Sequence, residues 1–87
     1  ITIVDVTATC NTAPTGAAAL FDVNKGGTTI FSTQGNRPTV AAGSQDGSAA
    51  TPDVTAVAAG DVLTVDIDQI GSSTVGADAT VVIRYTT

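Results

Sequence analysis

Asp66 and Asp68 are the two side chains whose type and spacing come closest to a catalytic pair. They stand two residues apart in an alternating segment, so both carboxylates project from the same face of a predicted strand. A glycosidase needs two carboxylates, one of them with a raised pKa, beside a cleft that binds sugar. Here the pair alternates with threonine on a face without aromatic residues. If the last two predicted strands pair with each other, Arg84 falls close to Thr64 and diagonal to Asp66, and we interpret these charges as an ordinary surface ion pair.

Metal binding and nucleophilic catalysis have no better candidates. Four more aspartates lie in or beside predicted loops, where carboxylates can bind calcium, but none fits the D-x-[DN]-x-[DN]-G spacing: Asp46, Asp53, Asp61 and Asp78. Cys10 has no histidine anywhere in the chain to act as its base, and we interpret it as a small buried apolar residue. No serine has a G-x-S-x-G context, and Gly26-Gly27 fits a hairpin turn. We therefore predict no catalytic residue, no cofactor and no metal.

The most distinctive polar cluster is the segment from Gln34 to Pro38, which interrupts the strand pattern. Its amides, Gln34 and Asn36, and the guanidinium of Arg37 are groups that can hydrogen-bond a glycan or a neighbouring subunit. An arginine before a proline can equally do no more than fix a turn, with its side chain in water. Both interpretations stay open. These three residues are our candidate contacts with a partner or a glycan.

The charge balance excludes two classes of partner. The 87 residues carry a net charge of −5, with eight aspartates against only Lys25, Arg37 and Arg84. Such a chain repels a phosphate backbone, so we predict no nucleic-acid binding. Binding to anionic lipid is disfavoured for the same reason, and no apolar stretch is long enough for membrane insertion. Only 13% of residues are charged, against about 25% in ordinary domains, and this weakly charged surface suits packing against copies of itself.

The core must be thin. The chain has two phenylalanines, one tyrosine, no tryptophan and no methionine, and its lone cysteine cannot form an internal disulfide. A domain of this length buries only about 60% of its unfolded surface. We therefore expect stability to come from oligomerisation or from a longer polypeptide. Since Ile1 opens directly in strand-like sequence, we expect residues 1–87 to form one domain that is the ordered part of a longer protein.

Strand patterns cover most of the chain. Threonine and valine dominate, glycines punctuate at turn-like intervals, and good helix formers are scarce. Alternation places Val4, Val6, Ala8 and Cys10 on one inward face, Leu63, Val65 and Ile67 on another, and Ala79, Val81, Ile83 and Tyr85 on a third. We predict an all-β fold, a small antiparallel β-sandwich of about seven to eight short strands. The predicted strands cover residues 1–9, 18–24, 28–33, 39–41, 51–57, 62–70 and 78–86, with a hairpin turn at 24–27.

Nearly the whole chain resembles a module that recurs in virion proteins of tailed bacteriophages. The resemblance is carried by residues 12–16 (TAPTG), 20–33 (LFDVNKGGTTIFST), 36–39 (NRPT), 59–71 (AGDVLTVDIDQIG) and 76–85 (GADATVVIRY). It implies a jelly-roll-like sandwich on the particle surface, either as a capsid decoration (cement) protein or as a module of a head or tail fibre. Such modules are typically trimeric. Its motifs are turns and strands, so it transfers no functional residue.

We accordingly expect a non-enzymatic structural protein of a bacteriophage virion. Its expected partners are copies of itself, as a homotrimer, and the major capsid protein or fibre and tail proteins. The alternative is a host-receptor or carbohydrate-binding module at a tail-fibre tip, which the scarcity of aromatic residues for stacking on sugars disfavours. A third interpretation is a secreted bacterial adhesin domain.

Overall fold

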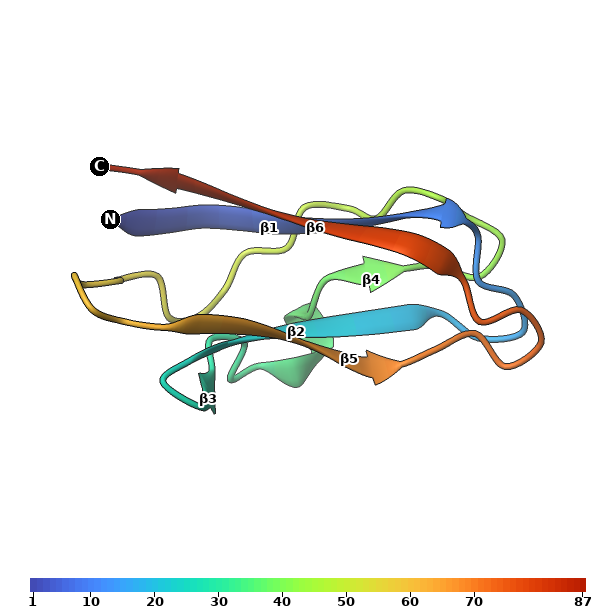
Figure 1. Ribbon diagram of the computed structural model, residues 1–87, viewed down its shortest axis with the longest axis horizontal. Helices are drawn as coiled ribbons and strands as arrows, with labels where there is room; N and C mark the ends of the chain where they lie inside the picture. Colours follow the sequence, from blue (N-terminus) through green and yellow to red (C-terminus); the bar gives the residue numbers. More distant parts are fainter.

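The computed structural model describes residues 1–87 and places two antiparallel sheets face to face (Figure 1). The strands are β1 (Thr2–Thr12), β2 (Ala19–Lys25), β3 (Thr28–Thr29), β4 (Thr39–Val40), β5 (Leu63–Gln69) and β6 (Ala77–Thr86). β1 and β6 form one sheet, and β2 is the centre of the other, with β3, β4 and β5. A single 3-10 turn, η1 (Gln34–Asn36), lies between β3 and β4. The structure contains no membrane-spanning helix. The predicted all-β sandwich is confirmed.

β1 and β6 form the longest ladder, and a β-bulge near its start corrects one predicted face. The register joins Ile3 to Tyr85 and Asp5 to Arg84, which leaves Val4 as an extra residue. The bulge reverses the alternation at this point, so Ile3 is buried and Val4 is exposed. The predicted inward positions further along the strand, Val6, Ala8 and Cys10, are buried as expected.

The predicted strand at 51–57 does not form as a strand. The chain between Asp46 and Ala56 instead runs along the edge of β1 that β6 leaves free, and it touches β1 only at isolated bridges such as Val6 with Ala50. At that bridge the two residues exchange both backbone hydrogen bonds at 2.8 Å. Pro52 has no N–H to continue a ladder, so pairing stays intermittent. The sandwich therefore has six strands rather than seven or eight.

The hairpin turn at 24–27 is confirmed. Gly26 and Gly27 have φ angles of 59° and 86°, which side chains with a Cβ rarely adopt. The returning strand is shorter than predicted, because β3 ends after Thr29 and the next two residues turn into the core. Ile30 and Phe31 are both fully buried there.

The core lies between the two sheets and thins toward one end. One cluster contains the larger side chains, namely Ile3, Val6, Val23, Ile30, Phe31 and Ala50. The other is built from Ala8, Cys10, Ala19, Phe21 and Val40, in which Phe21 is the only large residue. The molecule is correspondingly long and thin, with extents of 40 × 21 × 19 Å.

β5 and β6 do not pair with each other, contrary to the prediction. β5 pairs with β2, and β6 pairs with β1, so the last two strands belong to different sheets (Figure 1). Both are edge strands on the same side of the sandwich, which we call the open side. Val65 and Ile67 lie on the inner face, opposite Val23 and Phe21, yet they are 47% and 62% exposed because no strand continues beyond them.

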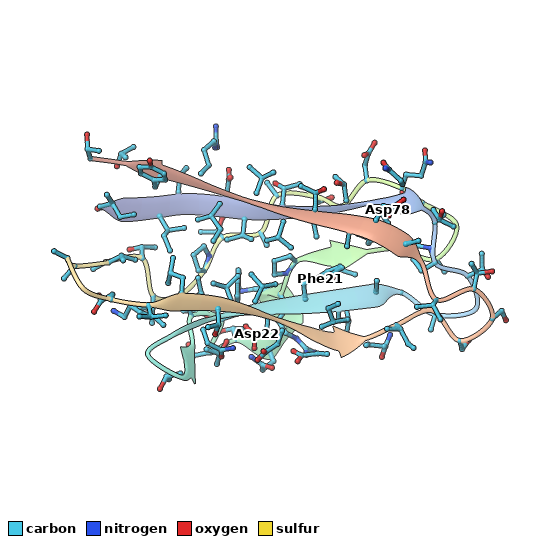
Figure 2. The ribbon with its side chains drawn as sticks, viewed as in Figure 1. Phe21, Asp22 and Asp78 are labelled. Carbon is cyan, nitrogen blue, oxygen red and sulfur yellow. The ribbon has the colours of Figure 1, made fainter.

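Asp22 is a buried carboxylate on the outer face of the four-stranded sheet. In Figure 2 Phe21 points between the sheets and Asp22 points away from them. The loop after β3 covers Asp22, which is only 6% exposed. One of its oxygens accepts hydrogen bonds from the Thr29 hydroxyl at 2.6 Å and from the Val23 N–H at 2.8 Å. The carboxylate thus fixes the loop that delivers Ile30 and Phe31 to the core.

Replacing Asp22 by alanine is expected to lower the free energy of unfolding by about 1–3 kcal/mol, because buried donors lose their acceptor. Chemical denaturation measures this change. The control is Asp46→Ala, which removes an exposed carboxylate that accepts no hydrogen bond and is expected to change the free energy of unfolding by less than about 0.5 kcal/mol. Equal losses for the two variants would show that the buried hydrogen bonds do not stabilise the loop.

Candidate functional site

Asp66 and Asp68 lie on the outer face of β5, and each binds one neighbouring side chain. Asp66 accepts a hydrogen bond from the Asn24 side-chain amide at 2.6 Å, and Asp68 accepts one from the Arg37 guanidinium at 2.8 Å. The two aspartates therefore link β5 to Asn24 and to Arg37, as expected of surface charges. The predicted proximity of Arg84 to Asp66 is wrong, because β6 pairs with β1 and not with β5.

Arg84 forms its ion pair with Asp5, its register partner on β1. Both the Nε and an Nη group of Arg84 hydrogen-bond the Asp5 carboxylate. This hydrogen bonding, together with the negative charge of Asp5, raises the pKa of Arg84. The pair uses two of the five N–H donors of the guanidinium, and the others make no hydrogen bond within the chain.

The remaining aspartates and Cys10 are dispersed. Asp61 accepts a hydrogen bond from the Ala58 N–H at 2.8 Å, which closes an ordinary turn. No three acidic, histidine or cysteine side chains gather closely enough to hold a metal ion. Cys10 is a free thiol buried between the sheets. The structure therefore brings none of these residues together into a site.

The predicted partner contacts separate into two groups. The side-chain amide of Gln34 donates to the Phe31 carbonyl at 2.6 Å and so braces its own loop. Arg37 donates from Nε to the Gln34 carbonyl at 2.8 Å and from Nη1 to Asp68, which ties η1 to β5. Asn36 is exposed, and its side chain makes no hydrogen bond. Of the three, Asn36 is the one with its full hydrogen-bonding capacity available.

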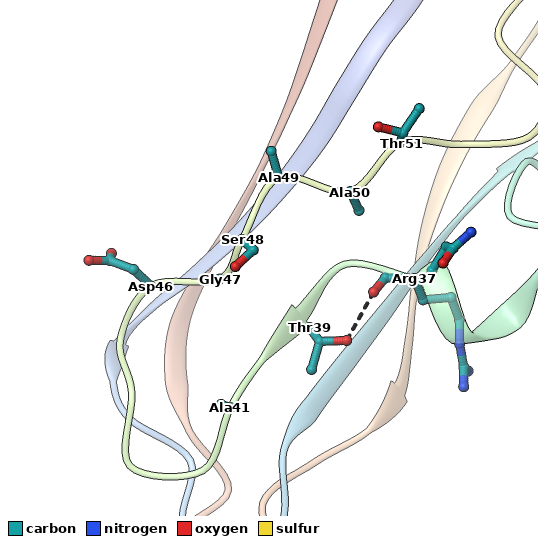
Figure 3. A pocket seen from close by; sticks show the side chains of 10 residues that line it. Arg37, Thr39, Ala41, Asp46, Gly47, Ser48, Ala49, Ala50 and Thr51 are labelled. Atoms are coloured by element: carbon teal, nitrogen blue, oxygen red, sulfur yellow. Dashed lines mark hydrogen bonds between the residues drawn. The ribbon is translucent and has the colours of Figure 1, made fainter.

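Asn36 and Arg37 line a hollow of about 510 Å³, which we call the polar hollow. It lies between residues 36–41, which include β4, and the segment 46–51 beside β1 (Figure 3). The Arg37 side chain points away from that segment, while its carbonyl accepts a hydrogen bond from the Thr39 hydroxyl at 2.9 Å. Small and polar residues form the walls, and no aromatic ring is among them. The hollow can hydrogen-bond a polar ligand but offers no stacking surface.

Two contacts hold the walls of the polar hollow in place. Gly47 packs so closely that a Cβ there would lie 2.5 Å from the Thr39 carbonyl oxygen and 2.7 Å from that of Ala8. Near the other end, the Asp53 carboxylate accepts hydrogen bonds from the N–H of Thr33 at 2.8 Å and from its hydroxyl at 3.3 Å. The backbone hydrogen bond is the main cause that lowers the pKa of Asp53.

A second hollow, about 190 Å³, opens between the sheets on the open side, and we call it the apolar hollow. It is lined by Cys10, Ala19, Phe21, Ile67, Ile70, Val75 and residues 76–79. Sequence reasoning missed it, because alternation shows which face of a strand is apolar but not whether another strand covers that face. The only sequence signal was the run of small residues from Gly76 to Ala79 beside large ones.

Compared with protein-family models, with curated proteins and with solved structures, the chain gives no match in any of the three. Two features stand out: the open side with its apolar hollow, and the polar hollow on the opposite side.

The lowered pKa of Asp53 makes the hydrogen bonds between its carboxylate and Thr33 sensitive to acid. Since the folded pKa lies below the usual value of 3.8, the stabilisation is present above that value and is lost as pH falls through the folded pKa. We expect the stability difference between the native chain and Asp53→Asn to shrink across this acid range and to be constant at neutral pH. Denaturation at a series of pH values measures it. A difference that is unchanged down to pH 2 would contradict the assignment.

Proposed function

We propose that this chain is a non-enzymatic structural module of a bacteriophage virion. In this function it decorates or stabilises the capsid, or forms part of a head or tail fibre, by symmetric association with copies of itself. Its location is the surface of the extracellular particle, and its other partners are the major capsid protein or the fibre and tail proteins. The sequence resemblance to phage virion modules suggests the particle, and the structure supplies a reason for association.

The observation that carries this proposal is the open side of the sandwich. Two edge strands, β5 and β6, end their sheets there without cover, and apolar side chains of the inner faces reach solvent. Exposed edges invite pairing with another chain, and soluble monomers usually protect them. An exposed apolar patch bounded by polar residues is typical of a protein interface. Association through the open side therefore buries these apolar side chains and enlarges the hydrophobic core.

The proposal predicts that the chain is a component of the phage particle. Virions purified from a phage that encodes this sequence should contain its peptides in stoichiometric amounts by mass spectrometry. Electron cryo-microscopy should show modules of about 40 × 21 × 19 Å at symmetry-related positions on the head or the tail. Recovery of the chain only in the soluble fraction of the lysate, with none on particles, would contradict it.

A second candidate function is a host-receptor or carbohydrate-binding module at a fibre tip. The polar hollow favours it, because Asn36 presents an unused amide at the rim of a 510 Å³ depression. Amide, hydroxyl and backbone groups are suitable hydrogen-bonding partners for sugar hydroxyls. The absence of an aromatic ring from the hollow weighs against it.

If the polar hollow binds a glycan, Asn36→Ala should reduce glycan-array binding at least about tenfold, the loss of one or two hydrogen bonds. Asn11→Ala is the matched control, since Asn11 is also exposed but lies outside the hollow. Arg37 is a poorer choice, because its replacement also breaks the ion pair with Asp68. No binding by the native chain across a broad array, or equal loss in both variants, would rule out this use of the hollow.

A further inference from the structure

The outer edge of β6 carries a row of backbone groups without partners. Hydrogen bonds to the neighbouring segment show that Val6, Ala8 and Cys10 direct their backbone groups away from β6. Their register partners on β6 are Ile83, Val81 and Ala79, which therefore direct their own N–H and C=O groups away from β1. No backbone hydrogen bond outside the β1–β6 ladder involves any residue of β6.

The outer edge of β5 differs in its charge. The register that pairs the whole of β5 with a second β5 places Asp66 opposite Asp66 of the other copy. Like charges directly opposite each other are destabilising, and charged side chains are a common protection of edge strands. β6 has no such pair of like charges, because its only charged residues are Asp78 near its start and Arg84 near its end. Of the two free edges, β6 is the one suited to pairing.

We infer that β6 pairs antiparallel with β6 of a second copy of this chain, about a two-fold axis at Val81. The pairing joins two two-stranded sheets into one four-stranded sheet of order β1-β6-β6-β1. In this register Val81 lies opposite Val81 of the second copy, and Ala79 lies opposite Ile83 of the second copy. These are the residues whose backbone groups point outward, so each such pair exchanges hydrogen bonds.

Charge complementarity favours this register over its neighbours. It places Asp78 opposite Arg84 of the second copy, and the two-fold axis repeats the pair. Asp78 has a φ of 54°, so regular strand geometry ends at this residue, and the inferred ion pair lies at the end of the β6–β6 ladder. Asp78 is exposed at the start of β6 (Figure 2), and Arg84 retains donors that Asp5 does not use. A shift of two residues in either direction separates the opposite charges.

Shape complementarity points to the same register. Tyr85 lies on the inner face of β6, opposite Ile3 of β1, and is 55% exposed. The inferred pairing puts it opposite Ala77 of the second copy, at the mouth of the apolar hollow. The hollow measures about 190 Å³, which exceeds the roughly 150 Å³ that holds a benzene ring in another protein. Each copy thus supplies one aromatic ring and one hollow to receive it.

The exposed apolar surface on the open side is of the size that a stable interface needs. Five large side chains there are about half exposed or more: Val65, Ile67, Ile70, Val75 and Tyr85. Their exposed parts amount to roughly 400 Å² per copy. A standard interface buries about 800 Å² per partner, a little over half of it apolar. The two open sides facing each other therefore supply the apolar part of such an interface.

This inference rests on the proposed function, because it names one of the contacts through which copies of the chain associate. It assigns a two-fold contact, whereas the resemblance to phage modules implies a three-fold assembly. A cyclic trimer contains no two-fold contact, so the two can be told apart.

Cysteine cross-linking tests the register. In a Cys10→Ala background, three single variants are made, Thr80→Cys, Val81→Cys and Val82→Cys, and each is oxidised mildly. Only a residue on the two-fold axis meets its own copy, so Val81→Cys alone should give a disulfide-linked dimer on a non-reducing gel. Mixing Thr80→Cys with Val82→Cys should also give a dimer, because those positions lie opposite each other. Thermal unfolding of the reduced variants checks that each is folded.

A second variant tests the contact without cysteines. Tyr85→Ala should raise the dimer dissociation constant at least about tenfold in analytical ultracentrifugation, because each half of the dimer loses the aromatic ring that fills the apolar hollow of the other. Val82→Ala, which shortens an exposed side chain on the outer face of β6, should change it less than about threefold.

Other outcomes would overturn the inference. Cross-linking of Thr80→Cys or Val82→Cys alone would show a register shifted by two residues. A trimer that gives no cross-link would overturn the β6 contact but leave the virion function standing. A monomer at high concentration that is nevertheless found on particles would do the same. A β6-linked dimer that is absent from particles would overturn the proposed function and leave the contact.

Discussion

Two sheets must cover each other's apolar faces, and this chain has only two strands, β1 and β2, with neighbours on both edges. The fully buried side chains of the core come from these two strands, from Val40 of β4, and from segments that cross beside them, such as Ile30 and Phe31. β5 and β6 cover their partner strands, but no further strand lies beyond them to cover their own side chains. The thin core, the elongated shape and the open side all follow from this shortage of strands.

The strand pattern predicted the architecture well because period-2 alternation reflects burial on one sheet face. It identified the first strand with inward residues such as Val6 and Ala8, and the hairpin at Gly26-Gly27. It failed where a local backbone change altered the period, as at the bulge around Val4. It also failed where a proline prevented a ladder, as at Pro52, since pairing depends on N–H donors that residue hydrophobicity does not reveal.

Pairing of strands was the part that sequence could not determine. The segments 62–70 and 78–86 are adjacent in the sequence and similar in pattern, so pairing with each other was the simple expectation. Adjacent strands often pair, but a longer loop between them lets each join a different sheet. Because the partner of Arg84 depends on this choice, its ion pair with Asp5 was not predictable. The exposure of Ile67 depends on the same choice, and so does the apolar hollow.

The two candidate surfaces lie on opposite sides of the sandwich, and this position bears on function. β6 and β5 border the open side, whereas the segment 46–56 and β4 occupy the other edges of β1 and β2. Association through the open side therefore leaves the polar hollow facing outward from the assembly. It also repeats the hollow at symmetry-related positions, where several weak contacts to one ligand-bearing surface act together. The two proposed functions, assembly and ligand binding, are consequently compatible in this one fold, because assembly would use the open side and ligand binding would use the polar hollow.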